Sequence, residues 1–275
     1  MLENAHLRAR TFYFLDLLAG RALGTRCPSC GSRTREPKVR KNAGLGTIFT
    51  CNGCGLLFRP TGLMSPAVAR WYYSNLYNEV SIASSMELQY DREALQRAVA
   101  GQGKDRSVAV SALVEQLPPA RRRIGVFGCS WGYEVELLRN AGLDAYGIEL
   151  SRPHREFANR ELRVTVYESA EAAGRAESNT GLVISSHVLE HIPRLHDALQ
   201  QIDRHLSPDV QLHIVPSVDP EVPLSTVRVI IGREHPLGVT REFWLRWAEA
   251  RGLAPELRMQ ENELWCTLRR PENAH

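Results

Sequence analysis

The stretch from Arg121 to Ser151 constrains the fold of this chain more than any other segment. It reads RRRIGVFGCSWGYEVELLRNAGLDAYGIELS, in which a short apolar run leads into a turn that contains Gly128 and Gly132. A helical pattern follows, and then a second apolar run that ends on the acid Glu149. A strand, a glycine turn, a helix and a strand that ends on a carboxylate are typical of the nucleotide-binding half of a Rossmann-like sheet.

Strand and helix patterns continue to alternate after this stretch. Further predicted strands are the apolar runs 164–167, 182–186, 211–215 and 264–268. This alternation predicts a doubly wound α/β fold with a mostly parallel sheet that helices cover on both faces. Ligands of such a sheet bind beyond the carboxyl ends of the strands. We therefore expect the glycine turn, Glu149, residues 167–168 and residues 185–191 to form the binding site.

The chain of 275 residues has room for one α/β domain and a smaller module. Its formal net charge of +3 does not by itself indicate a nucleic-acid partner, although basic residues gather at 33–41 and 121–123. No apolar run approaches the roughly 20 residues of a membrane span, and the first residues lack the layout of a signal peptide. We expect a cytoplasmic protein, in which paired thiols are more often metal ligands than disulfides.

Two C-x-x-C pairs precede the α/β region and are separated by twenty residues. Their cysteines are Cys27, Cys30, Cys51 and Cys54. Each pair can direct two thiolates at one metal, and the intervening segment is long enough for a hairpin with a returning strand at 47–50. Four thiolate ligands leave no open coordination position, so the pattern predicts a structural Zn²⁺ in a zinc ribbon. The alternative is two reduced pairs without a metal.

The sequence divides into four predicted parts. They are an N-terminal helix at 1–24, the zinc ribbon at 25–60, a helical linker or lid at 61–120, and the α/β domain at 121–275. Ser65 and Pro66 are a typical helix start in the linker. Of the aromatic residues that follow, Trp71 is predicted to pack in the core. The hydroxyls of the tyrosines need polar partners and are predicted to reach a substrate cleft; these residues are Tyr72, Tyr73 and Tyr77.

The spacing of the glycine turn also indicates which class of ligand it can bind. Its spacing, G-C-S-W-G, lacks the G-x-G-x-x-G form that places a pyrophosphate on a helix N-terminus, and no Walker lysine is present. This favours an adenosine ligand without phosphates.

Residues 121–268 resemble the class I S-adenosylmethionine-dependent methyltransferases. The resemblance rests on the motifs VFGCSWGYEVELLRNAG, YGIELS and VISSHVLEHIPRLHDAL. The chain also resembles a narrower bacterial group, the methyltransferases of sugar, glycan and natural-product pathways that carry an N-terminal zinc ribbon. This narrower resemblance rests on the paired cysteines, the segment CNGCGLLFRP and the aromatic helix WYY.

The resemblance implies a set of residues that bind S-adenosylmethionine. Those around the methionine part are Gly128, Ser130 and Gly132, with Trp131 or Tyr133 covering it. Those around the ribose and the adenine are Glu149, Leu150 and Glu168, and those beside the methyl donor are Ser186 and His187. Two positions depart from the family pattern, because Val126 replaces a common acid and Ser130 replaces a common glycine.

Methyl transfer to a hydroxyl benefits from a base of near-neutral pKa, for which histidine is suited. The candidates are His187, His191 and His235. His235 lies in the segment REHPLGVT, which is expected to fold over the cleft. His191 can equally be a structural residue next to a helix start, and His187 is expected to form a wall of the cleft.

Three functions fit this sequence. The first is methyl transfer to a small molecule, above all to a hydroxyl of a sugar, glycan or secondary metabolite. The second is an RNA methyltransferase whose zinc module and basic segments grip the RNA, although the chain lacks an N-P-P-Y motif and its Cys129 lies within the cofactor turn. The third is a degenerate methyltransferase fold that serves as a binding subunit. Val126, which replaces the common acid, favours this function, whereas the retained Glu149 counts against it.

Overall fold

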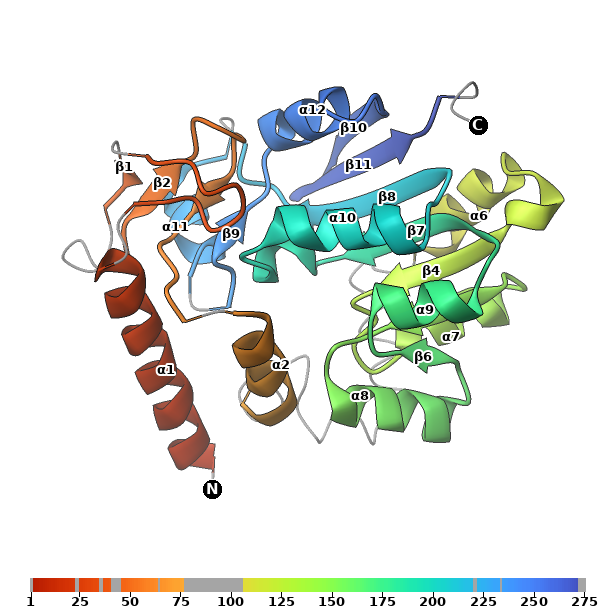
Figure 1. Cartoon of the computed structure of the whole chain (residues 1–275), viewed down its shortest axis with the longest axis horizontal. Coiled ribbons are helices and arrows are strands. Elements are labelled where there is room, and N and C mark those ends of the chain that lie inside the picture. Colours follow the sequence, from red (N-terminus) through yellow and green to blue (C-terminus); the bar gives the residue numbers. More distant parts are fainter. Residues whose placement is uncertain are drawn as a thin grey trace. The chain divides into compact units, whose positions relative to one another are not determined.

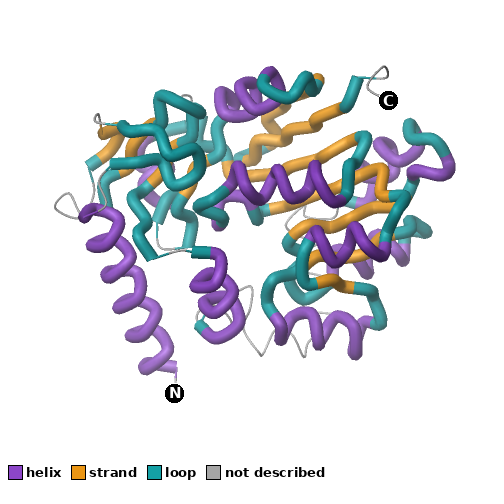
Figure 2. Tube along the Cα trace, viewed as in Figure 1, coloured by secondary structure: helices purple, strands orange, loops and turns teal. Residues whose placement is uncertain are grey.

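The computed structural model describes residues 2–22, 25–34, 37–40, 46–63, 65–76, 106–219, 222–232 and 234–271. Figure 1 labels most of its helices and strands, and Figure 2 shows how they alternate with loops along the chain. The chain divides into two compact units. The first comprises Met1–Thr11, Ser65–Ile184 and Gln201–Asp209, and the second comprises Phe12–Met64, Ser185–Gln200 and Val210–His275. Within the described ranges, no helix is long and apolar enough to cross a membrane.

Seven of the described strands form one sheet. They are β4 (Arg123–Phe127), β5 (Ala145–Ile148), β6 (Val166–Tyr167), β7 (Thr180–Ser186), β8 (Val210–Pro216), β10 (Ala254–Gln260) and β11 (Glu263–Arg269). The strand order is β10-β11-β8-β7-β4-β5-β6. β4 runs parallel to β5 and β7, and β5 to β6, whereas β11 runs antiparallel to β8 and β10. The predicted Rossmann-like α/β fold with a mostly parallel sheet is confirmed.

The strands of the first unit are buried because helices pack on the sheet. Every residue of β5 is buried, and so are the three central residues of β4. The helices of this part are α6 (Ser107–Glu115), α7 (Tyr133–Asn140), α8 (Arg152–Phe157) and α9 (Ala170–Ala176), with the helical turns η3 (Pro119–Arg121) and η4 (Ala158–Leu162). α7 contacts β5 and α9 contacts β6. Strands buried in this way read as continuous apolar runs, which is why the sequence located β4 and β5 closely.

Several described helix starts have side-chain N-caps, one of which is the cap predicted at Ser65. Ser65 precedes α2 (Pro66–Asn75), and its side chain accepts a hydrogen bond from the backbone N–H of Val68 at 3.3 Å. Thr240 precedes α12 (Arg241–Glu249) and accepts from the N–H of Phe243 at 3.1 Å. Ser151 occupies the N-cap position of α8, but its side chain makes no capping hydrogen bond.

The second unit contains a four-stranded sheet built around the ribbon. Its strands are β1 (Pro37–Val39), β2 (Ile48–Thr50), β3 (Leu57–Phe58) and β9 (Leu237–Gly238), in the order β1-β2-β3-β9 and antiparallel throughout. Val39, Ile48 and Leu57 form a buried cluster with Val218, Val227 and Ile231. The fourth strand, β9, comes from a segment about 180 residues further along the chain than β3. Local sequence patterns could not indicate a pairing between such distant segments.

Several described elements did not follow from the sequence. Residues 217–238, expected to be partly irregular, contain α11 (Leu224–Ile230) as well as β9. α9 also lacked a recognisable pattern. β10 lies at the edge of its sheet and buries none of its residues, so it lacks the apolar alternation of a half-buried strand.

The core prediction for Trp71 is wrong, because its side chain on α2 is 51% exposed. Tyr72 and Leu76 are buried instead. Residues four apart lie on the same face of a helix, whereas the next residue along points about 100° away. Only one of the neighbours Trp71 and Tyr72 can therefore face inwards.

A buried ion pair joins α1 (Leu2–Ala22) to the ribbon within the second unit. Arg59 Nη1 lies 2.7 Å from Asp16 Oδ2, and both side chains are at most 4% exposed. The other carboxylate oxygen accepts hydrogen bonds from the N–H groups of Gly62 and Leu63, each at 2.9 Å. Arg59 Nε donates to the carbonyl of Gly232 at 2.6 Å. Because water does not reach these groups, each of them relies on the others for its hydrogen bonds.

We expect Asp16→Asn to lower the free energy of unfolding by about 2 kcal/mol. The amide oxygen can replace one acceptor, but the hydrogen bond between two charged groups is lost. Urea unfolding of both proteins measures the difference. Asp197→Asn is the matched control, because Asp197 forms an exposed ion pair with Arg194 and should cost less than about 0.5 kcal/mol. Equal effects of the two substitutions would contradict the prediction.

Candidate active site

The glycine turn lies directly after β4 and is held against the end of β5. The N–H groups of Gly128 and Cys129 donate to the carbonyl of Ile148 at 2.7 and 3.2 Å. The backbone has a positive φ at Gly128, Ser130 and Gly132, with values of 74°, 49° and 88°. A non-glycine residue rarely adopts this conformation, so Ser130 is the strained position of the turn. The turn presents backbone to a ligand at the carboxyl ends of two parallel strands.

Glu149 connects this turn to the start of α8. Its Oε2 accepts from the N–H of Ser130 at 2.9 Å, and its Oε1 accepts from the N–H of Ser151 at 2.7 Å. Burial raises the pKa of the Glu149 carboxyl, and the two hydrogen bonds counteract that rise. Arg155 Nη1 donates to the carbonyls of Glu149 and Leu150 at 2.9 and 2.8 Å. Arg155 could not be predicted as part of the site, because a lone arginine on a helix has no distinctive sequence pattern.

Aromatic side chains pack behind the turn. Trp131 and Tyr133 are buried, and the Trp131 ring lies 3.9 Å from that of His154 and 5.2 Å from that of Phe157. Ser130 Oγ and His154 Nδ1 are 3.5 Å apart. A Cβ atom on Gly132 would lie 2.7 Å from the Cβ of Ala158. This position therefore requires glycine for close packing as well as for its positive φ.

Buried histidines should make the protein sensitive to acid. Burial lowers the pKa of His154 and of His213 to about 3, so both stay neutral when folded, whereas the unfolded chain binds their protons below a pH of about 6.5. The free energy of unfolding should therefore fall as pH drops below about 6.5, by up to about 1.4 kcal/mol per pH unit for each histidine. Urea unfolding at several pH values measures the slope. His154→Phe should remove the contribution of one histidine to this slope, and an unchanged slope would contradict the prediction.

Glu168 follows β6 and is mostly exposed, with its carboxylate 3.8 Å from Arg155 Nη2. Next to it, Ser169 caps α9 by accepting from the N–H of Ala172 at 3.1 Å. Of the predicted tyrosines, Tyr72 is buried and meets Tyr73 edge to face at a centroid distance of 5.4 Å. Tyr77 lies outside the described residues.

In the second unit, a group of charged and imidazole side chains surrounds the end of β7. Ser186 is the last residue of the strand, and His187 follows it with a positive φ of 54°. His187 Nε2 lies 2.7 Å from Glu263 Oε1, and its Nδ1 lies 3.6 Å from Glu190 Oε1. Burial alone would lower the pKa of His187, but the two facing carboxylates outweigh it and raise this pKa to about 9. The sequence had not indicated Glu263, which comes from β11.

His191 and His235 meet in the same unit, although they are 44 positions apart in the sequence. Their rings are perpendicular at a centroid distance of 4.4 Å. His191 Nδ1 lies 2.9 Å from the carbonyl oxygen of Glu234, and His235 Nδ1 lies 3.0 Å from that of Ile230. Two of the three histidines predicted as bases thus form one pair.

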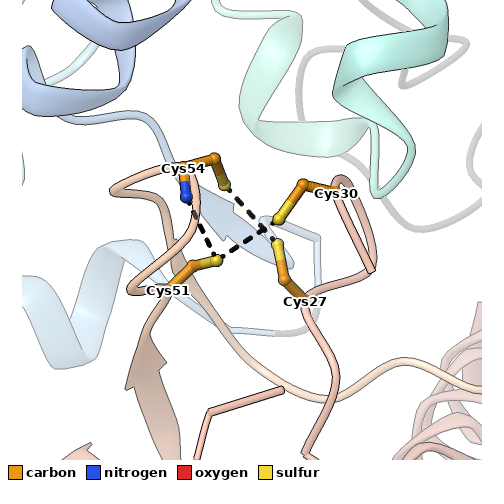
Figure 3. A group of neighbouring side chains, drawn as sticks. All are labelled: Cys27, Cys30, Cys51 and Cys54. Atoms are coloured by element: carbon orange, nitrogen blue, oxygen red, sulfur yellow. Dashed lines mark hydrogen bonds between the residues drawn. The ribbon is translucent and has the colours of Figure 1, made fainter. Parts of the chain in front are cut away.

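The four cysteines of the ribbon gather in one place, with their sulfur atoms directed towards one another (Figure 3). Their Sγ atoms all lie within 4.8 Å of one another. Cys27 and Cys54 are 3.8 Å apart, and Cys30 and Cys51 are 3.4 Å apart. A tetrahedral Zn²⁺ with Zn–S bonds of about 2.3 Å separates its sulfurs by about 3.8 Å. Gly31 and Gly55 end the two turns with positive φ, and each donates to the carbonyl of the first cysteine of its pair.

Comparison with known families identifies the chain. A model described as a methyltransferase domain matches residues 104–258, which is more than half of the sequence. The chain belongs to this methyltransferase family. The predicted reaction class, S-adenosylmethionine-dependent methyl transfer, agrees with this assignment. The family description does not specify an acceptor.

Several solved structures resemble this methyltransferase. The methyltransferase domain of bacterial CtHen1 is 15% identical, with a TM-score of 0.48 over 61% of this chain and 98% of that one. A TehB-like S-adenosylmethionine-dependent methyltransferase from Corynebacterium glutamicum is 18% identical, with a TM-score of 0.47 over 68% and 100%. A third, from Archaeoglobus fulgidus, is 16% identical, with a TM-score of 0.44 over 60% and 94%. No curated protein matched the chain.

Proposed function

We propose that this methyltransferase transfers a methyl group from S-adenosylmethionine to a hydroxyl of a small molecule, such as a sugar, a glycan or a secondary metabolite. The pair His191 and His235 carries the proposal. A carbonyl oxygen only accepts hydrogen bonds, so each ring bears a proton on Nδ1, and in the neutral ring the lone pair is on Nε2. A lone pair fixed in this way suits the removal of a hydroxyl proton.

In the proposed reaction, this proton transfer accompanies the transfer of the methyl group. The acceptor oxygen forms a bond to the methyl carbon as the bond between that carbon and the sulfonium sulfur breaks. The hydroxyl proton passes to an imidazole Nε2, and S-adenosylhomocysteine is the leaving group. Alignment of the oxygen behind the methyl group supplies much of the acceleration.

His187 suits this task less well than the other two histidines. Both of its ring nitrogens face carboxylates, those of Glu190 and Glu263. Nε2 lies within hydrogen-bond distance of Glu263, whereas Nδ1 faces Glu190 at 3.6 Å. Two negative charges beside the ring favour the imidazolium, which has no lone pair. We propose that His187, with Ser186, borders the methyl donor and contributes a positive charge at the end of β7.

The cofactor roles proposed for the first unit rest on the geometry of its turn. Glu149 would bind the ribose hydroxyls, because each of its oxygens accepts one backbone N–H and retains a further lone pair. The turn from Gly128 to Gly132 would hold the methionine part, with Ser130 at its strained centre. Trp131 and Tyr133 are buried and pack against Phe157, so we propose that they support the turn. Leu150 and Glu168 would flank the adenine.

The charged side chains of the first unit favour a small molecule over RNA. All three arginines of the basic run at 121–123 are engaged within the protein. Arg121 pairs with Asp209 at 2.8 Å, and Arg123 pairs with Asp144 and Glu177 at 2.8 and 2.7 Å. Arg122 Nε donates to the carbonyl of Leu117 at 3.1 Å. Cations neutralised in this way are poorly suited to phosphate contacts, which supply most of the affinity for RNA.

We also propose that the four cysteines hold a structural Zn²⁺. The spacing of the sulfurs fits a tetrahedral ion, and the N–H of Cys54 points at Cys51 Sγ from 3.4 Å. Thiolates are the ligands that zinc prefers in closed sites, and four of them leave no position for a substrate. The ion would therefore stabilise the ribbon without taking part in methyl transfer.

Replacement of the paired histidines should separate acceptor activation from cofactor binding. We expect His191→Ala and His235→Ala to lower kcat by about 10²- to 10⁴-fold, with little change in S-adenosylmethionine affinity by calorimetry. The assay follows transfer of labelled methyl groups to a panel of hydroxylated small molecules and, in parallel, to bulk RNA. His205→Ala, outside the pair, is the matched control. Labelling of RNA alone, or full activity of both variants, would contradict the proposal.

A further inference from the structure

A carboxylate joins the paired histidines in the second unit. One ligand atom each from Glu190, His191 and His235 lies within 4.8 Å of the others. Glu190 and His191 belong to the helical turn η5 (Leu189–His191) after β7, whereas His235 lies just before β9. Two imidazoles and one carboxylate, brought together from separate segments, are a ligand set that divalent transition metals bind with open positions remaining.

The carboxylate of Glu190 is the informative member of this group. Its side chain is 1% exposed, and neither of its oxygens has a hydrogen-bond partner among the described residues. The nearest described cation is His187, whose Nδ1 is 3.6 Å from Oε1, beyond the range of a hydrogen bond. A buried carboxylate without hydrogen bonds is costly. Its position is explained if a cation occupies the space in front of it.

The two histidines are oriented as metal ligands usually are. A ligating imidazole nearly always donates its other ring N–H to a carbonyl or carboxylate, which fixes the ring and its tautomer. His191 and His235 make this contact through Nδ1, to the carbonyls of Glu234 and Ile230 at 2.9 and 3.0 Å. The same contacts place the Nε2 lone pairs on the opposite side of each ring.

We infer that Glu190, His191 and His235 form a binding site for a divalent first-row transition metal ion, separate from the four-cysteine cluster. Three protein ligands leave coordination positions for water or for an acceptor oxygen. The binding of the ion does not depend on the proposed function. Only the role of the ion in methyl transfer rests on that proposal. With the ion bound, the Nε2 lone pairs would hold the metal and would no longer accept the hydroxyl proton. The metal would lower the pKa of a bound acceptor hydroxyl, and the proton would pass to water.

Titration of the zinc-loaded full chain with Co²⁺ tests the site without reference to methyl transfer. We expect Co²⁺ to bind and to give the weak visible bands of nitrogen and oxygen ligands. Thiolate charge-transfer bands in the near ultraviolet would show instead that Co²⁺ had entered the cysteine cluster. Glu190→Gln and His235→Asn should each weaken Co²⁺ binding by at least about tenfold. His205→Asn is the matched control and should leave the titration unchanged.

The variants keep the inference falsifiable even if one of them misfolds. Circular dichroism checks each fold, and His235 is half-buried on a loop where asparagine is tolerated more easily than a change at buried Glu190. Loss of Co²⁺ binding in a folded His235→Asn would support the site. Absence of Co²⁺ binding in the unaltered protein, binding with thiolate bands alone, or equal binding in the variants and the control would each overturn it. Because S-adenosylmethionine binding is measured separately, failure of the metal site does not affect the proposed reaction.

Discussion

Glu149→Ala should abolish measurable S-adenosylmethionine binding and also destabilise the first unit. The carboxylate satisfies two backbone N–H groups, those of Ser130 and Ser151, at 2.9 and 2.7 Å. Removal of an acceptor from a buried donor costs about 1–3 kcal/mol for each group left unpaired. The unfolding free energy should therefore fall by several kcal/mol, and affinity for the cofactor by at least about 100-fold, because the ribose contact and the shape of the turn are lost together.

Two further variants separate these effects. Glu149→Gln keeps one carbonyl acceptor but turns an amide N–H₂ towards the second donor, so its loss of stability should be intermediate. Glu156→Ala on α8 removes an exposed glutamate that pairs with Arg152, and it should change neither cofactor affinity nor stability appreciably. Calorimetric titration and thermal unfolding provide the two measurements. Tight cofactor binding by folded Glu149→Ala would refute the proposed ribose contact, and absence of binding by the unaltered chain would favour a non-catalytic binding role.

The sequence was most informative about the first unit because its signals are local. A buried parallel strand reads as an apolar run, and a positive φ in a tight turn favours glycine, so β4, β5, Gly128 and Gly132 could be located directly. The contacts of Glu149 could not be foreseen, because they join backbone groups whose direction depends on the folded turn. Ser130 illustrates the same limit, since a serine at a φ of 49° departs from the expected glycine and its N–H is one of the groups that position Glu149.

The second unit depends on contacts between distant segments, and the sequence was correspondingly less informative there. The motif S-H-V-L-E-H identified His187 and His191 as candidates, but the partner carboxylate of His187 comes from β11, 76 residues later. β3 and β9 pair although neither is long enough to form a recognisable strand pattern. Such pairings are decided by burial in the complete fold and not by local propensity.

These long-range contacts tie the cysteine cluster to the segment that carries His235. The N–H of Arg59, at the end of β3, donates to the carbonyl of Pro236, and β3 pairs with β9. Arg246 Nη1 on α12 also donates to the carbonyls of Asn52 and Gly53, in the second cysteine turn, at 2.6 and 2.9 Å. The second cysteine turn is thus tied to α12, and β3, which follows this turn, is tied to β9.

Loss of one of the proposed zinc ligands should therefore have the largest effect on stability. We expect Cys51→Ser to lose the bound metal and to lower the melting temperature strongly, because structural zinc sites contribute apparent binding energies of about 10–16 kcal/mol in isolated peptides, comparable with the entire stability of a domain. Metal analysis and thermal unfolding measure both changes. Cys266→Ala is the matched control. This cysteine is buried on β11 and is not part of the cluster, so its replacement should retain the metal and cost about 1 kcal/mol.

The damage in Cys51→Ser should extend beyond the ribbon along the β3–β9 pairing. Hydrogen exchange should show lost protection at 46–63 and 234–240, whereas the strands at 123–127 and 145–148 stay protected because their contacts lie within the first unit. Cofactor binding should then persist while acceptor methylation fails, since His235 loses the strand that positions it. Retained zinc in Cys51→Ser would contradict the assignment of the ligands. Lost zinc with unchanged protection at 234–240 would show that the ribbon does not support the His235 segment.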